Sequence, residues 1–425
     1  MNAFSRPPIH MSPIDILLSD VAIRIQLSQT DYDKAVARYE TMQEWIDRPA
    51  SPLTGLVARM YAQGSMATGS TVAQNSDADE YDIDVMAELT IREDSPPDVV
   101  LDTLFDAIRG EPGSRYYAMT VRHTRCVCVR YADGMHIDIT PAVLIPSLQE
   151  RTSWIFHHKP DAPNEPGYRL LANPYGLADY FNARTPIERD FAAFYEQRSL
   201  AYDRMTVEAR AHGEPVPDQQ PAYRKSRALI SLQLLKRWRN VLFERPARAK
   251  LRRPPSVLLS KLVADNAGRS ASLSEELHLQ ARAILECLLA EKSFGRLIHE
   301  VNPRCSGDVL TDRWPGDHAA QDLLIADLRD FCTKMEALRF GDLSLAQMSV
   351  ILEGLFGERP ARSALNDYIT RQGQLSRLGE TGIQPGTGRI TGLITGVGGG
   401  FASGPSAARP VPAHNFYGGI ARKKR

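Results

Sequence analysis

The spacing of apolar residues predicts both helices and strands in the first third of the chain. Residues 13–47 carry apolar side chains at helical intervals, and residues 96–110, "PPDVVLDTLFDAIRG", form a short amphipathic pattern that ends at a glycine. Strict alternation in "MTVRHTRCVCVRY" and "MHIDITPAVL" indicates two strands joined by a turn at Asp133-Gly134. This part of the chain is therefore expected to mix helix and sheet.

From about residue 178 onward the pattern is helical. The expected helices are 178–212, 223–244, 273–299, 319–338 and 344–356. After about residue 378 the chain is rich in Gly, Pro and Ser, a composition that buries too little apolar surface to offset its ordering entropy, so a disordered tail is expected there. The predicted division is a mixed α/β (α+β) lobe at 1–177, a helical lobe at 178–377 and a flexible tail at 378–425.

Bulk composition narrows the class of protein. The 425 residues contain 51 Lys plus Arg and 51 Asp plus Glu, so the overall charge indicates no particular partner. Five scattered cysteines predict no disulfide framework. The sequence contains neither an apolar signal segment nor an apolar run of about 18 residues, which favours a cytoplasmic protein without a membrane span.

Two acids stand on one face of an otherwise apolar strand. In "YDIDVM" side chains alternate, so Asp82 and Asp84 point the same way, and "HIDIT" places Asp138 in a similar setting. Three carboxylates on neighbouring strands would repel one another unless a cation lay between them, and Mg²⁺ prefers oxygen ligands of this kind. A D-x-D pair on a strand also arises by chance, so this motif alone is weak.

A small-residue turn precedes the paired acids and strengthens the metal hypothesis. Gly64 lets the backbone approach a triphosphate closely, and Ser65 can offer its hydroxyl and its N–H to phosphate oxygens. A second such turn, "TGST", follows. Paired metals between carboxylates and phosphates are the arrangement used for phosphoryl or nucleotidyl transfer.

The combination "GSMATGSTV…DEYDIDV…HIDITPAV" resembles the nucleotidyltransferase superfamily and, more narrowly, the bacterial cGAS/DncV-like nucleotidyltransferases (CD-NTases). Two more stretches, "NPYGLADYFNAR" and "SLQLLKRWRN", are similar to the inter-lobe and spine-helix motifs of that family, and "VNPRCSGDVLTDRW" resembles its C-terminal-lobe motif. The resemblance covers roughly residues 40 to 355.

The resemblance implies a bilobed fold, with a mixed twisted sheet in the N-terminal lobe and a helical C-terminal lobe. It implies that Asp82, Asp84 and Asp138 coordinate two Mg²⁺, for which Mn²⁺ can substitute, and that Gly64 and Ser65 hold nucleotide phosphates. The implied activity joins ATP and other nucleoside triphosphates into a cyclic oligonucleotide with release of pyrophosphate, in bacterial anti-phage (antiviral) defence signalling. An adenine-containing cyclic trinucleotide is the first expectation for the product, and a cyclic dinucleotide is the second.

Residues 224–253 form a basic segment, with eleven Lys or Arg and a single acid. Lys225 and Lys236 are eleven residues apart, about three helical turns, so they share a face. A solvated face is the usual fate of such charge, but the family's spine helix carries a Lys at the "LLKR" position that faces the triphosphate. The nucleotide-binding candidates are Lys236 first, then Lys225 and Ser226, with Arg237 and the base-stacking Tyr223 as weaker ones.

Other polar residues are assigned modest roles. His136 is expected to be a second-layer or core histidine, and the acids Asp77, Asp79 and Glu80 are expected to be solvated. The tail end "PVPAHNFYGGIARKKR", with Phe416 and Tyr417, is typical of a docking peptide. The resemblance suggests a HORMA-domain or conjugation-type partner there, and a nucleic-acid activator is the competing idea.

Two other functions stay open on the sequence. The first is a linear, template-independent nucleotidyl or poly(A)-type transferase, for which the basic segment would serve equally well. The second is a catalytically silent nucleotide-binding regulator. Product topology separates the first from a cyclic synthase, because a cyclic product has no terminal phosphate.

Overall fold

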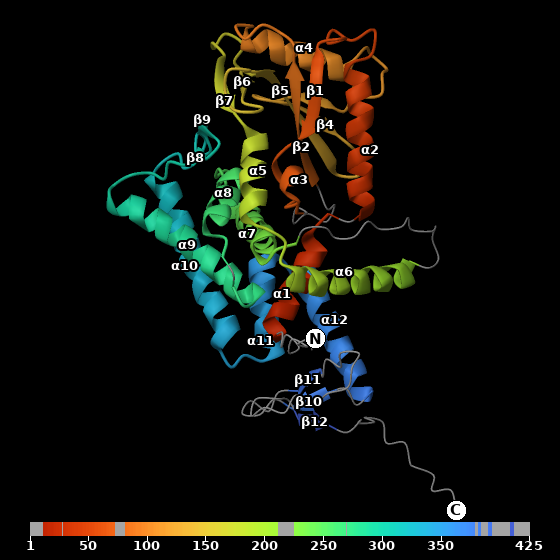
Figure 1. Ribbon diagram of the computed structural model, residues 1–425, viewed down its shortest axis with the longest axis vertical. Helices are drawn as coiled ribbons and strands as arrows, with labels where there is room; N and C mark the ends of the chain where they lie inside the picture. The colour runs from red at the N-terminus through yellow and green to blue at the C-terminus, as the bar shows by residue number, and fades with distance from the viewer. Residues whose placement is uncertain are drawn as a thin grey trace, which may run out of the picture.

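The computed structural model describes most of the chain. The described residues are 12–27, 29–72, 81–210, 225–268, 270–378, 381–383, 390–392 and 409–411. Tyr223, the acids at 77, 79 and 80, and Phe416 and Tyr417 lie outside them. Figure 1 shows the arrangement expected from the resemblance, a sheet-containing lobe above a lobe of helices.

The first lobe is built on one mixed seven-stranded sheet. Its strands are β1 (Val57–Ala62), β2 (Tyr81–Leu89), β3 (Thr120–Arg122), β4 (Val127–Arg130), β5 (Met135–Leu144), β6 (Ser153–His157) and β7 (Tyr168–Ala172). The order is β1-β2-β5-β4-β3, and β6 pairs with both β5 and β7. The β2–β5 pair is parallel and the other pairs are antiparallel. The hairpin predicted around Asp133-Gly134 is the β4–β5 pair.

Two helices cover one face of this sheet: α2 (Gln29–Ile46) and α4 (Pro97–Arg109). Apolar side chains of the sheet, among them Ile83, Val85 and Ile139, form a single core with Met42 and Leu104 from these helices. The alternate residues of β2 and β5 point to the opposite face, which carries the acids.

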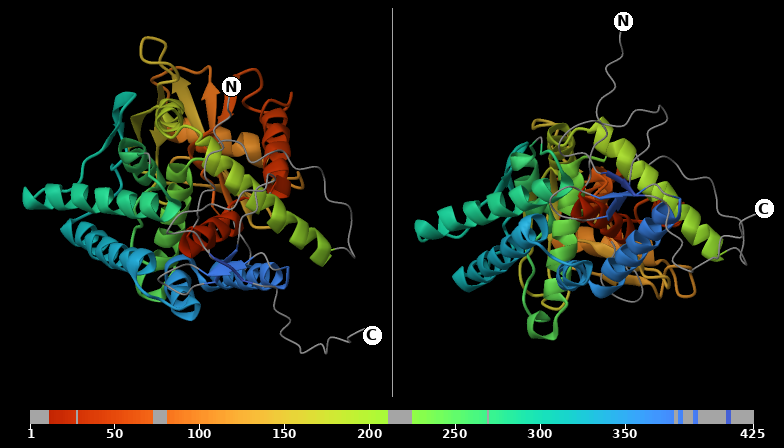
Figure 2. Two further views of the ribbon diagram at one scale, coloured as in Figure 1. Left: turned by 60° about the horizontal axis from the view of Figure 1, so that its bottom comes forward. Right: turned by 90° about the horizontal axis from the view of Figure 1, so that it is seen from below.

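The second lobe is helical. Its elements are α5 (Pro174–Arg184), α6 (Arg189–Arg210), α7 (Arg227–Phe243), α8 (Ser256–Asn266), α9 (Leu273–Ser293), α10 (His318–Phe340), α11 (Leu345–Phe356) and α12 (Glu358–Arg377), with a small hairpin of β8 (Val301–Asn302) and β9 (Cys305–Val309). In both views of Figure 2, α9 and α10 run side by side. Fifteen of the seventeen residues of α7 are buried, so α7 is the spine of the lobe.

The predicted helix over 13–47 is in fact two helices that serve different cores. The first, α1 (Pro13–Ile25), ends at Gln26, whose backbone is extended. Leu17 and Val21 of α1 are buried in the core of the helical lobe, whereas α2 packs on the sheet. Arg24 Nε also donates to Ser363 Oγ of α12 at 2.9 Å, across 339 residues of sequence. The N-terminal helix therefore belongs with the second lobe and not with the catalytic lobe in which the sequence division placed it.

Two motifs quoted from the sequence meet at the junction of the lobes. Asn173 caps α5 by accepting from Gly176 N at 2.7 Å, and its backbone N–H donates to Asp308 Oδ2 at 3.0 Å. Asn302 Nδ2 donates to the Asn173 carbonyl at 2.7 Å. "NPYG" and "VNPRCSGD" are thus two halves of one hydrogen-bonded joint.

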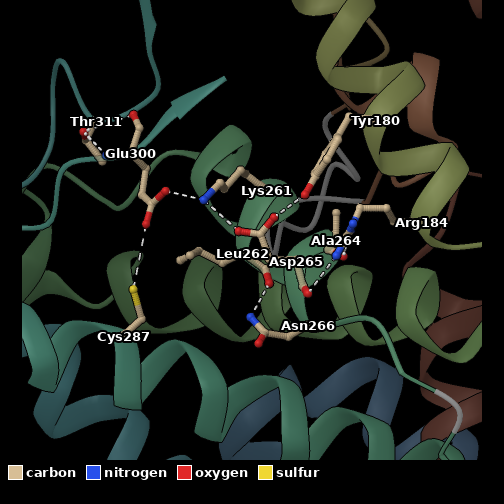
Figure 3. A network of polar contacts seen from close by, with 10 residues as sticks. All are labelled: Tyr180, Arg184, Lys261, Leu262, Ala264, Asp265, Asn266, Cys287, Glu300 and Thr311. Atoms are coloured by element: carbon tan, nitrogen blue, oxygen red, sulfur yellow. Dashed lines mark hydrogen bonds and ion pairs between the residues drawn. The ribbon is translucent and has the colours of Figure 1, made fainter. Parts of the chain in front are cut away.

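A second polar network ties α5 to α8 (Figure 3). Tyr180 Oη donates to Asp265 Oδ1 at 2.6 Å, and Lys261 pairs with both Asp265, at 2.7 Å, and Glu300. Arg184 Nε donates to the Ala264 carbonyl at 2.9 Å near the end of α8. Because α5 directly follows the last strand of the sheet, this network fixes the orientation of the helical lobe.

Three short strands are described where the sequence predicted a disordered tail. They are β10 (Thr381–Ile383), β11 (Ile390–Gly392) and β12 (Arg409–Val411), with β10 in the centre and both β10 and β11 against α12. Antiparallel backbone pairing of β10 with both neighbours gives these segments regular structure. No helix in the described ranges is both long and apolar enough to cross a bilayer.

We predict that packing between Trp238 and Phe331 stabilises the spine helix α7. Phe331 of α10 is fully buried, with its ring centroid 5.0 Å from that of Trp238 in α7. Phe331→Ala should lower the free energy of unfolding by about 3–5 kcal/mol through lost contacts and a cavity. Phe340→Ala on the same helix, where the side chain is 74% exposed, is the matched control. Similar urea midpoints for the two variants would contradict this account of the core.

Candidate active site

The sheet brings the predicted carboxylates together. In the parallel β2–β5 pair, Asp84 lies opposite Asp138, and Asp82 lies opposite His136. Neighbouring strands are about 4.8 Å apart, so Asp84 and Asp138 are adjacent on the face away from α2 and α4. The three acids therefore share one site, as the sequence predicted.

The electrostatics of this site are those of crowded carboxylates. Burial, followed by the charges of Asp138 and Asp82, raises the pKa of Asp84 to about 7. Asp138 Oδ1 is buried without a hydrogen-bond partner in the described structure. In the described ranges no three His, Cys, Asp or Glu side chains form a ready metal cluster, so an ion would have to draw the carboxylates together. The mutual repulsion of these carboxylates and the unpaired Asp138 Oδ1 are what a divalent cation would relieve.

The turn after β1 is shaped around Asp84. Gly64 begins the short helix α3 (Gly64–Thr68) with φ +56°, and a Cβ at this position would stand 2.7 Å from Asp84 Oδ2. The Gln63 N–H donates to the Asp84 carbonyl at 2.9 Å. Only glycine allows the backbone to approach the carboxylate this closely.

Ser65 and the second small-residue turn form one hydrogen-bonded unit. Thr71 Oγ1 donates to Ser65 Oγ at 3.2 Å, and the Ser70 N–H donates to the Ser65 carbonyl at 2.9 Å. The Thr68 and Ser70 hydroxyls are hydrogen-bonded to each other, with 2.7 Å between Thr68 Oγ1 and Ser70 Oγ. Gly64 and Ser65 thus lie beside the acids, as predicted.

Lys236 reaches this unit from the helical lobe. Its side chain is 3% exposed, and Nζ donates to the Ser70 carbonyl at 3.0 Å and to Ser70 Oγ at 3.1 Å. Burial, followed by Arg239, lowers the pKa of Lys236 to about 7, whereas the negative charge of Asp84 acts to raise it. One turn earlier, Gln233 Nε2 donates to the Thr71 carbonyl at 3.0 Å. The spine helix therefore brings to the site an amine that gains or loses its proton near neutral pH. Gln233 is a site residue that the sequence analysis did not name, and Ser70 and Thr71 belong to the "TGST" turn, in which it gave neither residue a role.

The other candidates on the basic segment have different settings. Ser226 is 2% exposed and caps α7, accepting from the Leu229 N–H at 3.1 Å. Arg237 Nε donates to the Phe356 carbonyl at 2.9 Å, toward the end of α11. Lys225 precedes the cap, and burial lowers its pKa to about 8. Helix capping explains why a serine stands at 226 without invoking a nucleotide. A hydrogen bond to α11 explains the position of the Arg237 side chain.

Two neighbours of the acids complete the site. His136 Nδ1 lies 3.5 Å from Asp82 Oδ1, which agrees with a second-layer histidine. Cys128 lies opposite Asp138 on β4, and burial, followed by Asp138, raises the pKa of Cys128 to about 12. This thiol therefore stays protonated beside the carboxylate.

Comparison with known proteins identifies relatives along most of the chain. Residues 11–154 match the Second Messenger Oligonucleotide or Dinucleotide Synthetase domain. The cyclic dinucleotide synthase CdnG of Bradyrhizobium diazoefficiens is 37% identical over 377 residues, 87% of each protein. A c-di-GMP synthase of Roseivirga ehrenbergii is 23% identical over 360 residues, 82% of this chain and 85% of that protein.

Solved structures agree with these matches. The Bradyrhizobium diazoefficiens CD-NTase CdnG in complex with GTP superposes with a TM-score of 0.72 at 34% identity, covering 84% of this chain and 99% of that one. Escherichia coli CdnC with ATP gives a TM-score of 0.52 at 17% identity, covering 80% and 96%, and so shares the fold.

We predict that Gly64 is required to position Asp84. Gly64→Ala should weaken Mn²⁺ binding about tenfold to a hundredfold, because the new methyl group would displace the Asp84 carboxylate. Gly69→Ala is the matched control: its φ is +67°, so the backbone strain is similar, but a Cβ there meets open space. Isothermal titration with Mn²⁺ measures both, and equal losses would remove the steric argument.

A second prediction concerns Ser226. Ser226→Ala should lower the free energy of unfolding by about 1 kcal/mol through loss of the helix cap. Nucleotide affinity should not change, because the hydroxyl is engaged with the Leu229 N–H. A tenfold weaker affinity for ATP or GTP in this variant would instead restore Ser226 as a nucleotide ligand.

Proposed function

Because this chain belongs to the CD-NTase family of cyclic oligonucleotide synthases, we propose that it joins nucleoside triphosphates into a cyclic dinucleotide and releases pyrophosphate. The observation that carries the proposal is the register that sets Asp84 against Asp138, within reach of the Gly64 turn and the charge of Lys236. Carboxylates, a close backbone approach and a buried lysine together suit a triphosphate whose α-phosphorus is attacked by a hydroxyl.

The ring size and the bases in this proposal come from the relatives. The sequence favoured an adenine-containing cyclic trinucleotide, whereas the 37%-identical relative is a cyclic dinucleotide synthase and was solved with GTP. A second relative is a c-di-GMP synthase. We therefore place the dinucleotide first and include GTP beside ATP among the substrates. The trinucleotide stays a prediction that the product's mass can decide.

The chain's own residues have distinct tasks in this reaction. Asp82, Asp84 and Asp138 would hold two Mg²⁺, with Mn²⁺ as a substitute; such ions, when bound, lower the pKa of an attacking hydroxyl and neutralise charge on leaving pyrophosphate. Ser65 would donate to phosphate oxygens from the turn that Gly64 begins. Phosphates bound beside Lys236 would favour its charged form, and its hydrogen bond to Ser70 would hold that turn in place.

The biological setting is proposed on the family resemblance. We place the enzyme in the bacterial cytoplasm, in anti-phage defence signalling. A HORMA-domain or conjugation-type protein docking on the tail, and a nucleic-acid activator, stay predictions, and residues 412–425 of the tail motif lie outside the described residues.

The decisive experiment is an incubation with all four nucleoside triphosphates and Mg²⁺ or Mn²⁺, followed by phosphatase treatment and mass spectrometry. We expect a phosphatase-resistant cyclic dinucleotide. The double variant Asp82→Ala plus Asp84→Ala should lose on the order of a thousandfold in rate, since it removes the ligands that stabilise the transition state. Asp106→Ala on α4, where the acid is exposed, is the control and should retain activity.

The same experiment separates the alternatives. A phosphatase-sensitive ladder of products would identify a linear nucleotidyltransferase. Nucleotide binding without turnover, persisting after addition of DNA and of a tail-binding partner, would identify a silent regulator. Unchanged activity in the double variant would show that these acids are not the catalytic centre.

A further inference from the structure

Three buried polar atoms near the active site have no hydrogen-bond partner in the described structure: Tyr61 Oη, Glu88 Oε1 and Arg151 Nε. Glu88 is only 4% exposed. Arg151 adopts φ 57°, a left-handed conformation that non-glycine residues rarely take. Buried polar groups are normally paired, and backbone strain collects at functional sites, so this combination calls for an explanation.

The three residues form one cluster with Tyr175. The Arg151 guanidinium lies 4.0 Å from the centroid of the Tyr175 ring and 4.9 Å from that of the Tyr61 ring. Burial, followed by the charge of Glu88, raises the pKa of Tyr61, so its hydroxyl keeps its proton and remains a donor. The cluster therefore presents a carboxylate, a guanidinium, a phenol and two aromatic rings.

The cluster lies on the same face of the sheet as the catalytic acids. Side chains alternate along β2, so Glu88 points to the same side as Asp84, about 13 Å further along the strand. Tyr61 stands on β1, opposite Met86 and three residues before Gly64. Tyr175 opens α5, and α5 also touches α3. A nucleotide with its phosphates at the Gly64 turn could extend its base along this face.

The chemistry of the cluster matches guanine. A carboxylate accepts from adjacent N–H donors, and guanine presents two such donors, N1–H and N2–H₂, on its Watson–Crick edge. Arginine is the residue that pairs with guanine O6 and N7. Adenine instead presents the N1 acceptor, which an ionised carboxylate repels. Arg151 already lies over one face of the Tyr61 and Tyr175 rings, so a base would stack on their opposite faces or on the guanidinium plane.

We propose that Glu88 and Arg151, flanked by Tyr61 and Tyr175, form a guanine-reading site that selects GTP over ATP. This proposal rests on the proposed function, since it places the base of a nucleotide whose phosphates the catalytic site holds. Glu88 accepts from guanine N1–H and N2–H₂, and Arg151 donates to the acceptor edge. A site built on buried polar groups rejects a base that leaves them unpaired.

The test is equilibrium binding of full-length protein to α,β-non-hydrolysable analogues of GTP, ITP and ATP. We expect the GTP analogue to bind at least tenfold more tightly than the ATP analogue, with the ITP analogue, which lacks the N2 amine, in between. Glu88→Gln should weaken GTP-analogue binding by about tenfold to a hundredfold and leave ATP-analogue binding unchanged. Glu111→Gln, at an exposed position, is the matched control.

Two results would overturn the proposal: equal affinity of the unmodified protein for all three analogues, or equal weakening of all three by Glu88→Gln, which would mark a structural role. Thermal unfolding checks that each variant is folded. Should Glu88→Gln not fold, Arg151→Lys carries the test, with the same selective loss expected.

Binding without turnover keeps this result separate from the proposed activity. Selective guanine binding through Glu88, with no cyclic product formed, would refute the synthase and leave the base site standing. A cyclic product made from adenine nucleotides alone would support the synthase and refute the base site.

Discussion

The repulsion between two carboxylates that face each other on parallel strands determines which residues can surround them. Asp84 and Asp138 are adjacent because the β2–β5 register makes them so, and their repulsion is strengthened by burial. The neighbouring elements accommodate these carboxylates with two features that a stable core would not need. Gly64, which has no side chain, lets the backbone lie close to the Asp84 carboxylate, and Lys236 of the helical lobe reaches the turn that follows Gly64. Local stability is reduced here, as is usual where residues serve a functional site and not the core.

The site also explains why the two lobes are held in one relative orientation. Lys236 is part of a helix that is buried along nearly its whole length, yet its ammonium group is hydrogen-bonded to Ser70 in the first lobe. Together with the Asn173 joint and the Tyr180–Asp265 contact, it makes the spine helix a fixed wall of the site. Precise placement of catalytic groups depends on supports of this kind.

The sequence predicted the two-lobed α/β fold and the grouping of the acids on one sheet face, but not every element around them. The D-x-D alternation and the Gly-Ser turn are local signals, and the β-hairpin at Asp133-Gly134 has a local turn code, so all three are readable without tertiary information. The helices α8 and α12 and the strands β1, β6 and β7 were not predicted, because their burial depends on partners distant in sequence. The single helix expected over 178–212 is divided into α5 and α6. Ser226 looks like a ligand in a basic segment until the helix boundary shows it to be a cap. The sequence analysis did not name Glu88, because a single acid near a strand end carries no local signal, and only the packed structure shows it buried.

The position of α1 has a consequence for how the chain is made. During synthesis the sheet lobe can complete its core once β7 has emerged, but α1 leaves the ribosome before that lobe and has no partner in its core. Its apolar face, with Ile14, Leu17 and Val21, stays uncovered until the helices around α7 follow, and the contact of Arg24 forms only with α12. Contacts this distant in sequence are slow to form and leave nascent chains open to aggregation. A helix that precedes the sheet lobe in the chain is thus among the last to be buried, and a protein truncated before α12 would leave it incompletely covered.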